Sequence, residues 1–183
     1  VSARHFCIQE SKGITMEIRI AGTVEDSIVD GPGLRFVVFV QGCPHHCDGC
    51  HNPETHDFSG GKLTTTDSLY EQCMENPLCR GVTFSGGEPF CQAEALYELG
   101  SRFRSAGKHL MCYSGWTYEE LMAKAQREEY VGKLLGILDV LVDGRFDISK
   151  RSLSLQFRGS SNQRLINVPE SLRTGAAVEY PEL

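Results

Sequence analysis

Short apolar runs recur along the chain and predict buried strands. Their lengths and their content of β-branched residues are typical of strands that are covered on both faces. The clearest run is LRFVVFV at residues 34–40. Four strands are predicted in all, at residues 34–40, 81–84, 109–113 and 137–142. A further strand-like segment begins at Met16.

The segments between these runs carry the signals of helices. Residues 92–106 have apolar side chains three or four positions apart, which predicts one amphipathic helix. A Ser or Thr followed three residues later by Glu has the spacing of a capping box. Two such pairs occur, Ser68 with Glu71 and Thr117 with Glu120. The first pair predicts a short helix, and the second predicts a helix through about Glu129.

The alternation of strands with helices decides the expected architecture. It implies an α/β fold with a mostly parallel sheet and right-handed crossovers. Four strands are too few for a closed barrel of eight, so we expect an open, partial (βα) barrel. Residues 16–183 are expected to form one domain, because no linker, repeat or low-complexity segment divides them. Residues 1–15 match no periodic pattern and are expected to be an extension, either disordered or not native.

Composition and charge narrow the classes of function. The 183 residues carry a formal net charge of −6, which argues against a general nucleic-acid binder, because neutralising phosphate takes clustered Lys and Arg. No apolar stretch approaches the roughly 18 residues of a membrane span, and the N-terminus has no apolar signal region. The eight cysteines are too sparse for a disulfide-stapled secreted scaffold. Reduced thiols in a cytoplasmic protein are therefore expected.

Three of the cysteines lie within eight residues of a polar loop that follows the first predicted strand. Cys43, Cys47 and Cys50 have the spacing C-x3-C-x2-C, and the glycine and proline residues around them favour tight turns. Buried structural thiols do not usually have this pattern. Three thiolates on a four-iron cluster leave one iron without a protein ligand, which is useful where a substrate must bind iron.

A zinc site is the alternative interpretation of this loop. Its fourth ligand would come from a nearby histidine, of which there are four: His45, His46, His51 and His56. Structural zinc sites usually have two paired ligand arms, and only one compact arm is present here. The spacing therefore favours an iron–sulfur cluster over zinc without excluding zinc.

A glycine-rich loop follows the second predicted strand. It reads Ser85-Gly86-Gly87-Glu88-Pro89. Paired glycines let the backbone approach a ligand closely, and a carboxylate beside them accepts charge-assisted hydrogen bonds from an ammonium group. Taken alone, such a sequence is most often only a turn. Because the carboxyl ends of parallel strands meet at one edge of a sheet, we expect this loop to face the cysteine loop.

Together the two loops resemble the radical S-adenosylmethionine superfamily, which has a C-x3-C-x2-C motif and a later G-G-E motif. DGPGLRF at residues 30–36, with QGC and CHNP in the cysteine loop, resembles the branch that activates glycyl radical enzymes. LVDGRF at 141–146 and FRGSSNQR at 157–164 resemble the activating proteins of anaerobic ribonucleoside-triphosphate reductase. The resemblance covers about residues 16–168.

This resemblance implies an oxidoreductase that carries a [4Fe-4S] cluster and uses S-adenosyl-L-methionine. Cys43, Cys47 and Cys50 would be the metal ligands. The amino and carboxylate groups of S-adenosylmethionine would chelate the iron that has no protein ligand. The other implied cofactor contacts are Gly49 and His51 beside the cluster, Gly86, Gly87 and Glu88 at the methionyl ammonium, and Ser114 near the carboxylate or ribose.

The sequence departs from this family pattern at two places. Many relatives have an aromatic residue just before the third cysteine that packs on adenine, where this chain has Gly49, so the adenine contact is expected elsewhere. The Asp-Thr-Asn-Gly stretch that binds a cation in pyruvate formate-lyase activases is replaced by CYSG at residues 112–115, so no cation site is expected there. The remaining cysteines have no ferredoxin-like spacing and are interpreted as structural: Cys7, Cys73, Cys79, Cys91 and Cys112.

The resemblance also implies a reaction and partners. Reductive cleavage of S-adenosylmethionine would give a 5′-deoxyadenosyl radical, which takes hydrogen from a backbone glycine of anaerobic ribonucleoside-triphosphate reductase. A flavodoxin or ferredoxin would supply the electron. No side chain is expected to act as a catalytic acid or base, and His45, His46 and His56 are interpreted as loop residues. Two alternatives remain, activation of another glycyl radical enzyme such as pyruvate formate-lyase, and a zinc-binding interaction module.

Overall fold

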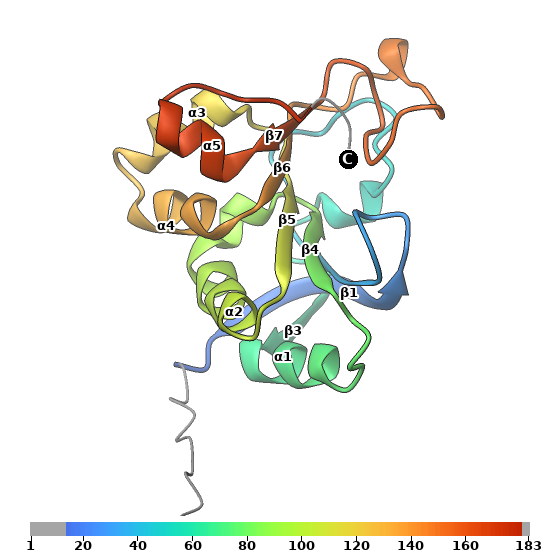
Figure 1. Ribbon diagram of the computed structural model, residues 1–183. Coiled ribbons are helices and arrows are strands. Elements are labelled where there is room, and N and C mark those ends of the chain that lie inside the picture. Colours follow the sequence, from blue (N-terminus) through green and yellow to red (C-terminus); the bar gives the residue numbers. More distant parts are fainter. Residues whose placement is uncertain (1–13, 181–183) are drawn as a thin grey trace, which may run out of the picture.

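A single twisted sheet organises the fold in the computed structural model, which describes residues 14–180 (Figure 1). Within that range the sheet has seven strands in the order β3-β1-β2-β4-β5-β6-β7. Their bounds are β1 Glu17–Ser27, β2 Arg35–Val40, β3 Lys62–Thr65, β4 Gly81–Gly86, β5 His109–Tyr113, β6 Val140–Asp143 and β7 Arg164–Asn167. The extension expected at residues 1–15 falls almost entirely on residues 1–13, which lie outside the described residues.

The four central strands, β2, β4, β5 and β6, run parallel and correspond to the four predicted strands. This confirms the α/β class. On the flanks, β1 pairs antiparallel with β2 and β3, and β7 pairs antiparallel with β6. The sequence analysis missed β3 and β7, because both are four-residue strands that are too short and too polar to form an apolar run. Among the described strands, β3 and β7 are the free edges, so no closed barrel forms.

Five α-helices accompany the described strands, four of them between strands and the last after β7. They are α1 Thr66–Met74, α2 Ala93–Ser105, α3 Tyr118–Ala125, α4 Glu129–Ile137 and α5 Val168–Thr174. The capping box of Thr117 with Glu120 is confirmed at the start of α3. The one predicted at Ser68 is wrong, because Thr65 caps α1 and accepts a hydrogen bond from the Ser68 backbone N–H.

The helix predicted to run to about Glu129 ends earlier, and a second helix that was not predicted follows it. The first, α3, ends at Ala125, and α4 begins at Glu129. The apolar run that predicted a strand from Ile137 belongs in part to α4, and β6 begins only at Val140. Apolar residues continue without a break from the buried face of this helix into the strand, so periodicity alone cannot place the boundary.

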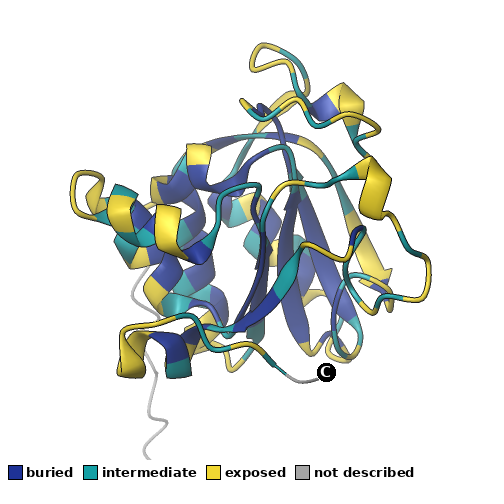
Figure 2. Cartoon of the chain, turned by 90° about the horizontal axis from the view of Figure 1, so that it is seen from above, coloured by how far each residue is buried: buried dark blue, intermediate teal, exposed yellow. Residues whose placement is uncertain are grey.

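The sheet has a different cover on each face. All five helices contribute buried residues to one core cluster with the strands, including Leu96, Leu99 and Phe103 of α2. Leu110 and Cys112 of β5 belong to this cluster, whereas Met111 between them belongs to a second, smaller one. Successive strand side chains point to opposite faces, so the second cluster marks the face that loops cover. Figure 2 shows the central strands buried between these two covers.

The motif DGPGLRF supplies part of the loop cover. Arg35 is fully buried and bonds to the Thr83 hydroxyl at 2.7 Å and to the Val82 carbonyl at 2.6 Å, and burial lowers its pKa to about 10. A Cβ on Gly31 would lie 2.8 Å from the Arg35 Nε, and the φ of +134° at this position also requires glycine. Thr83 in turn donates to the Asp30 carbonyl. These contacts hold the segment before β2 against the loop-covered face.

Candidate functional site

A cavity of about 500 Å³ lies beyond the carboxyl ends of the parallel strands. The loops after β2, β4, β5 and β6 all contribute to its lining, and Figure 1 shows the loops after β2 and β6 at the same end of the sheet. Seven of the nine predicted site residues line it: Cys43, Cys47, Cys50, His51, Gly86, Gly87 and Ser114. The fold therefore brings together the two loops that the sequence analysis expected to face each other.

Two backbone hydrogen bonds join the first residues of the cysteine loop to its last residues. The N–H of Gly42 donates to the Thr55 carbonyl at 2.8 Å, and the N–H of Cys43 donates to the His56 carbonyl at 3.1 Å. Gly49 has a φ of +70°, and a Cβ there would lie 2.6 Å from the Ile148 Cδ1 atom. Glycine is thus required at this turn both by its backbone angle and by the close approach of the loop after β6.

The three thiols suit an iron–sulfur cluster. Burial raises the pKa of the Cys43 and Cys47 thiols, and backbone hydrogen bonding at His45 partly offsets this for Cys43. The Asn52 backbone N–H also donates to the Cys50 sulfur at 3.4 Å. Within residues 14–180, no group of three or more His, Cys, Asp or Glu residues is arranged around one metal ion. A four-iron cluster takes each thiolate on a different iron, so its ligands need only border one cavity, as these do.

The glycine pair is explained by contact between the two loops. The N–H of Gly87 donates to the Val40 carbonyl and that of Glu88 to the Gly42 carbonyl, both at 2.8 Å. A Cβ on Gly87 would lie 2.4 Å from the Gly42 oxygen, and one on Gly86 would lie 2.7 Å from the Val40 oxygen. Only glycine allows the two loops to approach so closely.

The Glu88 side chain is buried behind the cavity lining and already has protein partners. Its Oε1 accepts from the Phe90 N–H, and its Oε2 accepts from the Gly115 N–H at 2.9 Å and contacts the His45 Nε2 at 2.8 Å. The Ser114 hydroxyl lies 3.1 Å from both oxygens. The carboxylate therefore links the loops after β2, β4 and β5.

Two further residues at this site were not among the cofactor contacts predicted from the sequence. His45 was interpreted as a loop residue, and its side chain is only 4% exposed. Arg158 lines the cavity, and its buried Nε has no hydrogen-bond partner among the described residues. The signal for Arg158 was its place in FRGSSNQR, where a long cationic side chain stands among small polar ones. No local pattern distinguishes His45 from its neighbour His46.

The FRGSSNQR motif folds back on itself and places Arg158 at the cavity wall. The Gln163 Oε1 accepts from the N–H groups of Gly159 and Ser160, and its Nε2 donates to the Gly144 carbonyl at 3.0 Å. The Arg158 Nη1 donates to the Gln163 carbonyl at 3.2 Å. The motif thus sets the shape of the loop between β6 and β7.

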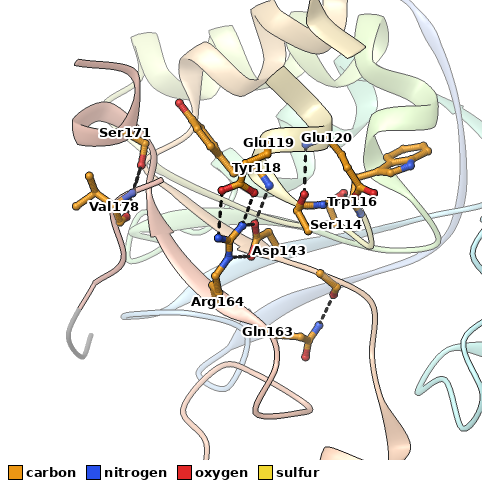
Figure 3. Close-up of polar contacts among 12 residues, drawn as sticks. Ser114, Trp116, Tyr118, Glu119, Glu120, Asp143, Gln163, Arg164, Ser171 and Val178 are labelled. Atoms are coloured by element: carbon orange, nitrogen blue, oxygen red, sulfur yellow. Dashed lines mark hydrogen bonds and ion pairs between the residues drawn. The ribbon is translucent and has the colours of Figure 1, made fainter. Parts of the chain in front are cut away.

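Both ends of this loop are fixed by the ion pair of Asp143 and Arg164. Asp143 is 1% exposed and accepts from the Arg164 Nε at 3.0 Å and from the Tyr118 N–H at 2.7 Å (Figure 3). Arg164 also donates to Glu119 of α3. Asp143 ends β6 and Arg164 begins β7, so the pair closes the loop that forms one wall of the cavity.

Comparison with known proteins identifies relatives over most of the chain. A family model described as a 4Fe-4S single cluster domain matches residues 29–166. The anaerobic ribonucleoside-triphosphate reductase-activating protein of Vibrio cholerae is 35% identical over 144 residues, 74% of this chain and 89% of the relative. Its counterpart in Escherichia coli K12 is 35% identical over 74% of this chain and 90% of the relative. The pyruvate formate-lyase-activating enzyme of Clostridium pasteurianum is 37% identical over 57% of this chain and 48% of the relative.

Proposed function

The chain belongs to the family of anaerobic ribonucleoside-triphosphate reductase-activating proteins, and from this premise we propose that it generates a glycyl radical on such a reductase. The observation that carries the proposal is the single cavity bordered by the three cysteines of one loop and the glycine pair of another. In this cavity, three thiols that can ligate iron lie beside space that a small cofactor can occupy.

Cys43, Cys47 and Cys50 would hold a [4Fe-4S] cluster. When bound, the cluster supplies the electron for reductive cleavage of S-adenosylmethionine. The chain's own contribution is to bury Cys43, to hold the loop in one shape through the backbone bonds at Gly42 and Cys43, and to donate an N–H to the Cys50 sulfur. Hydrogen bonds to the sulfurs and burial are among the means by which a protein tunes such a cluster.

S-Adenosylmethionine would occupy the remaining cavity. We propose that His51, Gly86, Gly87 and Ser114 flank it, since all four line the cavity. Gly49 and Glu88 would act from behind this lining, Gly49 by allowing the loop after β6 to approach and Glu88 by organising the loops around its carboxylate. The lining includes Gly86 and Gly87 but not Glu88, so we propose that the glycine pair, rather than Glu88, lies at the methionyl ammonium.

Other cavity residues supply contacts that the family motifs leave open. Arg158 lines the cavity, and its Nε has no hydrogen-bond partner within residues 14–180, so its guanidinium suits the methionyl carboxylate, because charged donors pair with carboxylates through short, strong hydrogen bonds. Aromatic side chains offer faces on which adenine can pack, and those in the lining are Phe39, Tyr113, Phe146 and Phe157. These residues replace the missing aromatic neighbour of the third cysteine.

The partner would present one glycine-bearing loop at the mouth of the cavity, and a flavodoxin or ferredoxin would deliver the electron. The reductase is favoured over pyruvate formate-lyase because the chain spans about nine-tenths of the reductase activators and under half of the Clostridium enzyme.

The partial-barrel curvature of the sheet, a single domain for residues 16–183 and a cytoplasmic location stay predictions. Within residues 14–180, no helix is long and apolar enough to cross a membrane.

The deciding experiment uses anaerobically reconstituted protein with S-adenosylmethionine, a low-potential reductant and anaerobic ribonucleoside-triphosphate reductase. A glycyl-radical doublet in the electron paramagnetic resonance spectrum of the reductase is expected. A doublet that formed only on pyruvate formate-lyase would make the alternative activase correct. Turnover of a small molecule with neither partner activated would overturn the proposal, and stoichiometric zinc without iron uptake would favour the interaction module.

A further inference from the structure

The turn that carries Cys43 is held from both sides by one residue of the other loop. Before the cysteine, the Gly42 carbonyl accepts from the Glu88 backbone N–H at 2.8 Å. After it, the His45 Nε2 lies 2.8 Å from the Glu88 Oε2. The first metal ligand therefore stands between two contacts to Glu88, one through the main chain and one through the side chain.

His45 can contact the Glu88 carboxylate only as a hydrogen-bond donor. A carboxylate only accepts hydrogen bonds, and this one already receives N–H groups from Phe90 and Gly115. The His45 ring nitrogen that faces it therefore carries the proton. Both side chains are buried, with 4% of His45 and none of Glu88 exposed, so water does not replace this donor if it is lost.

The His45 ring is held in the orientation that this contact requires. It packs edge-on against Trp116, with ring centroids 4.7 Å apart and an interplanar angle of 74°. On another side it lies so close to Gly115 that a Cβ there would be 2.3 Å from the ring. The neighbouring His46 is exposed, and its ring packs against the ring of His56. Of the two histidines in this turn, His45 alone reaches the glycine loop.

We propose that His45 is a positioning residue that fixes the turn carrying Cys43 against the glycine loop, so that the cluster ligands and the cofactor-binding backbone face the cavity in one arrangement. The proposal rests on the proposed function and adds a residue to it. His45 lines the cavity, but the role proposed for it acts through Glu88 and positions the turn rather than holding the cluster or S-adenosylmethionine. The alternative is that His45 only fills space in the core. In that case S-adenosylmethionine binding should not depend on the ring nitrogen that faces Glu88.

Two conservative substitutions separate these possibilities. The amide nitrogen of glutamine reaches about as far from the backbone as the histidine Nε2, whereas that of asparagine reaches only as far as Nδ1. H45Q should keep the contact and bind S-adenosylmethionine within about threefold of the unaltered protein, while H45N should bind about ten- to hundredfold more weakly. The cluster signal of H45N in electron paramagnetic resonance should also respond less to added S-adenosylmethionine than that of H45Q.

The matched control is H46N, the same substitution one residue along. Asparagine tolerates the φ of +48° at this position, so H46N should fold and bind S-adenosylmethionine like the unaltered protein. H45N combined with E88Q should weaken binding by less than the two separate losses together, because both changes act on the contacts of one carboxylate. Additive losses, or an H45N variant that binds like H45Q, would overturn the proposal.

A measurement on the unaltered chain covers the case in which H45N does not fold. The ring ¹⁵N resonances of His45 in cluster-free protein should show a protonated Nε2. A bare Nε2 with a protonated Nδ1 would contradict the contact to Glu88. If the unaltered protein took up iron but bound no S-adenosylmethionine, the proposed function would fail, and the resonances of His45 would still decide the positioning role.

Discussion

The sulfur atoms of Cys73 and Cys79 lie 3.7 Å apart in the core beneath the helices, and neither residue lines the cavity. Cys73 belongs to α1 and Cys79 precedes β4, so the pair joins the helix to the start of a central strand. This placement is what the interpretation of these cysteines as structural requires.

Iron content should therefore separate the two groups of cysteines. Replacing Cys43, Cys47 or Cys50 by Ala should abolish the brown cluster of about four irons and four sulfides after anaerobic reconstitution. C73A and C79A should keep the full cluster and lose only stability, because each leaves a small buried cavity. Iron and sulfide analysis with the absorption spectrum checks this. Loss of iron from C73A would assign a ligand role outside the cysteine loop.

Glu88→Gln should keep the cluster and weaken S-adenosylmethionine binding. The substitution places an amide donor among groups that already donate, so at least one of the contacts to His45, Phe90 or Gly115 is lost. A hydrogen bond to a charged group contributes about 1.5–3 kcal/mol, which corresponds to roughly ten- to hundredfold in affinity. Equilibrium binding to the reconstituted protein measures the effect. An unchanged dissociation constant would mean that residues 85–89 are only a turn.

Arg158→Gln should weaken binding of S-adenosylmethionine by about tenfold or more, because it removes the cationic donor proposed for the methionyl carboxylate. The comparison is with decarboxylated S-adenosylmethionine, for which R158Q and the unaltered protein should differ little. Arg151, an exposed arginine in the same loop, provides the control variant R151Q. Equal losses with both ligands would show that Arg158 contacts something other than the carboxylate.

Arg164→Gln should lower the free energy of unfolding by about 1–3 kcal/mol, because it takes two donors from the buried Asp143 carboxylate. Arg173→Gln is the control, since Arg173 pairs with Glu170 on the surface and is 71% exposed, and it should change stability little. Urea unfolding of the cluster-free protein compares the two. Equal effects would mean that the pair does not hold the loop between β6 and β7.

Replacing the radical-bearing glycine of the reductase by Ala should remove the glycyl-radical signal without stopping cleavage of S-adenosylmethionine. Cleavage depends on this chain's cavity, whereas the radical product needs a partner backbone carbon that no side chain shields. Formation of 5′-deoxyadenosine and the paramagnetic signal are measured on the same sample. A signal that persisted would place the radical on another residue.

The sequence by itself determined those features that depend on residues close together in the chain. The apolar runs predicted the four parallel strands, and the spacing of Thr117 and Glu120 predicted a helix start, because a capping box involves only residues within one turn. The cysteine spacing likewise identified the thiols that border the cavity. Parallel strands with helical crossovers required the following loops to share one edge of the sheet.

Tertiary structure decided the partners of residues that lie far apart in the chain. Glu88 reaches His45 across 43 positions and Ser114 across 26, and no pattern in either segment records such a contact. The short strands β3 and β7 exist because β1 and β6 offer them backbone hydrogen bonds, which their own side chains do not signal. The same holds for Arg158, which becomes significant only because the fold places it at the cavity wall with an Nε that no described residue accepts from.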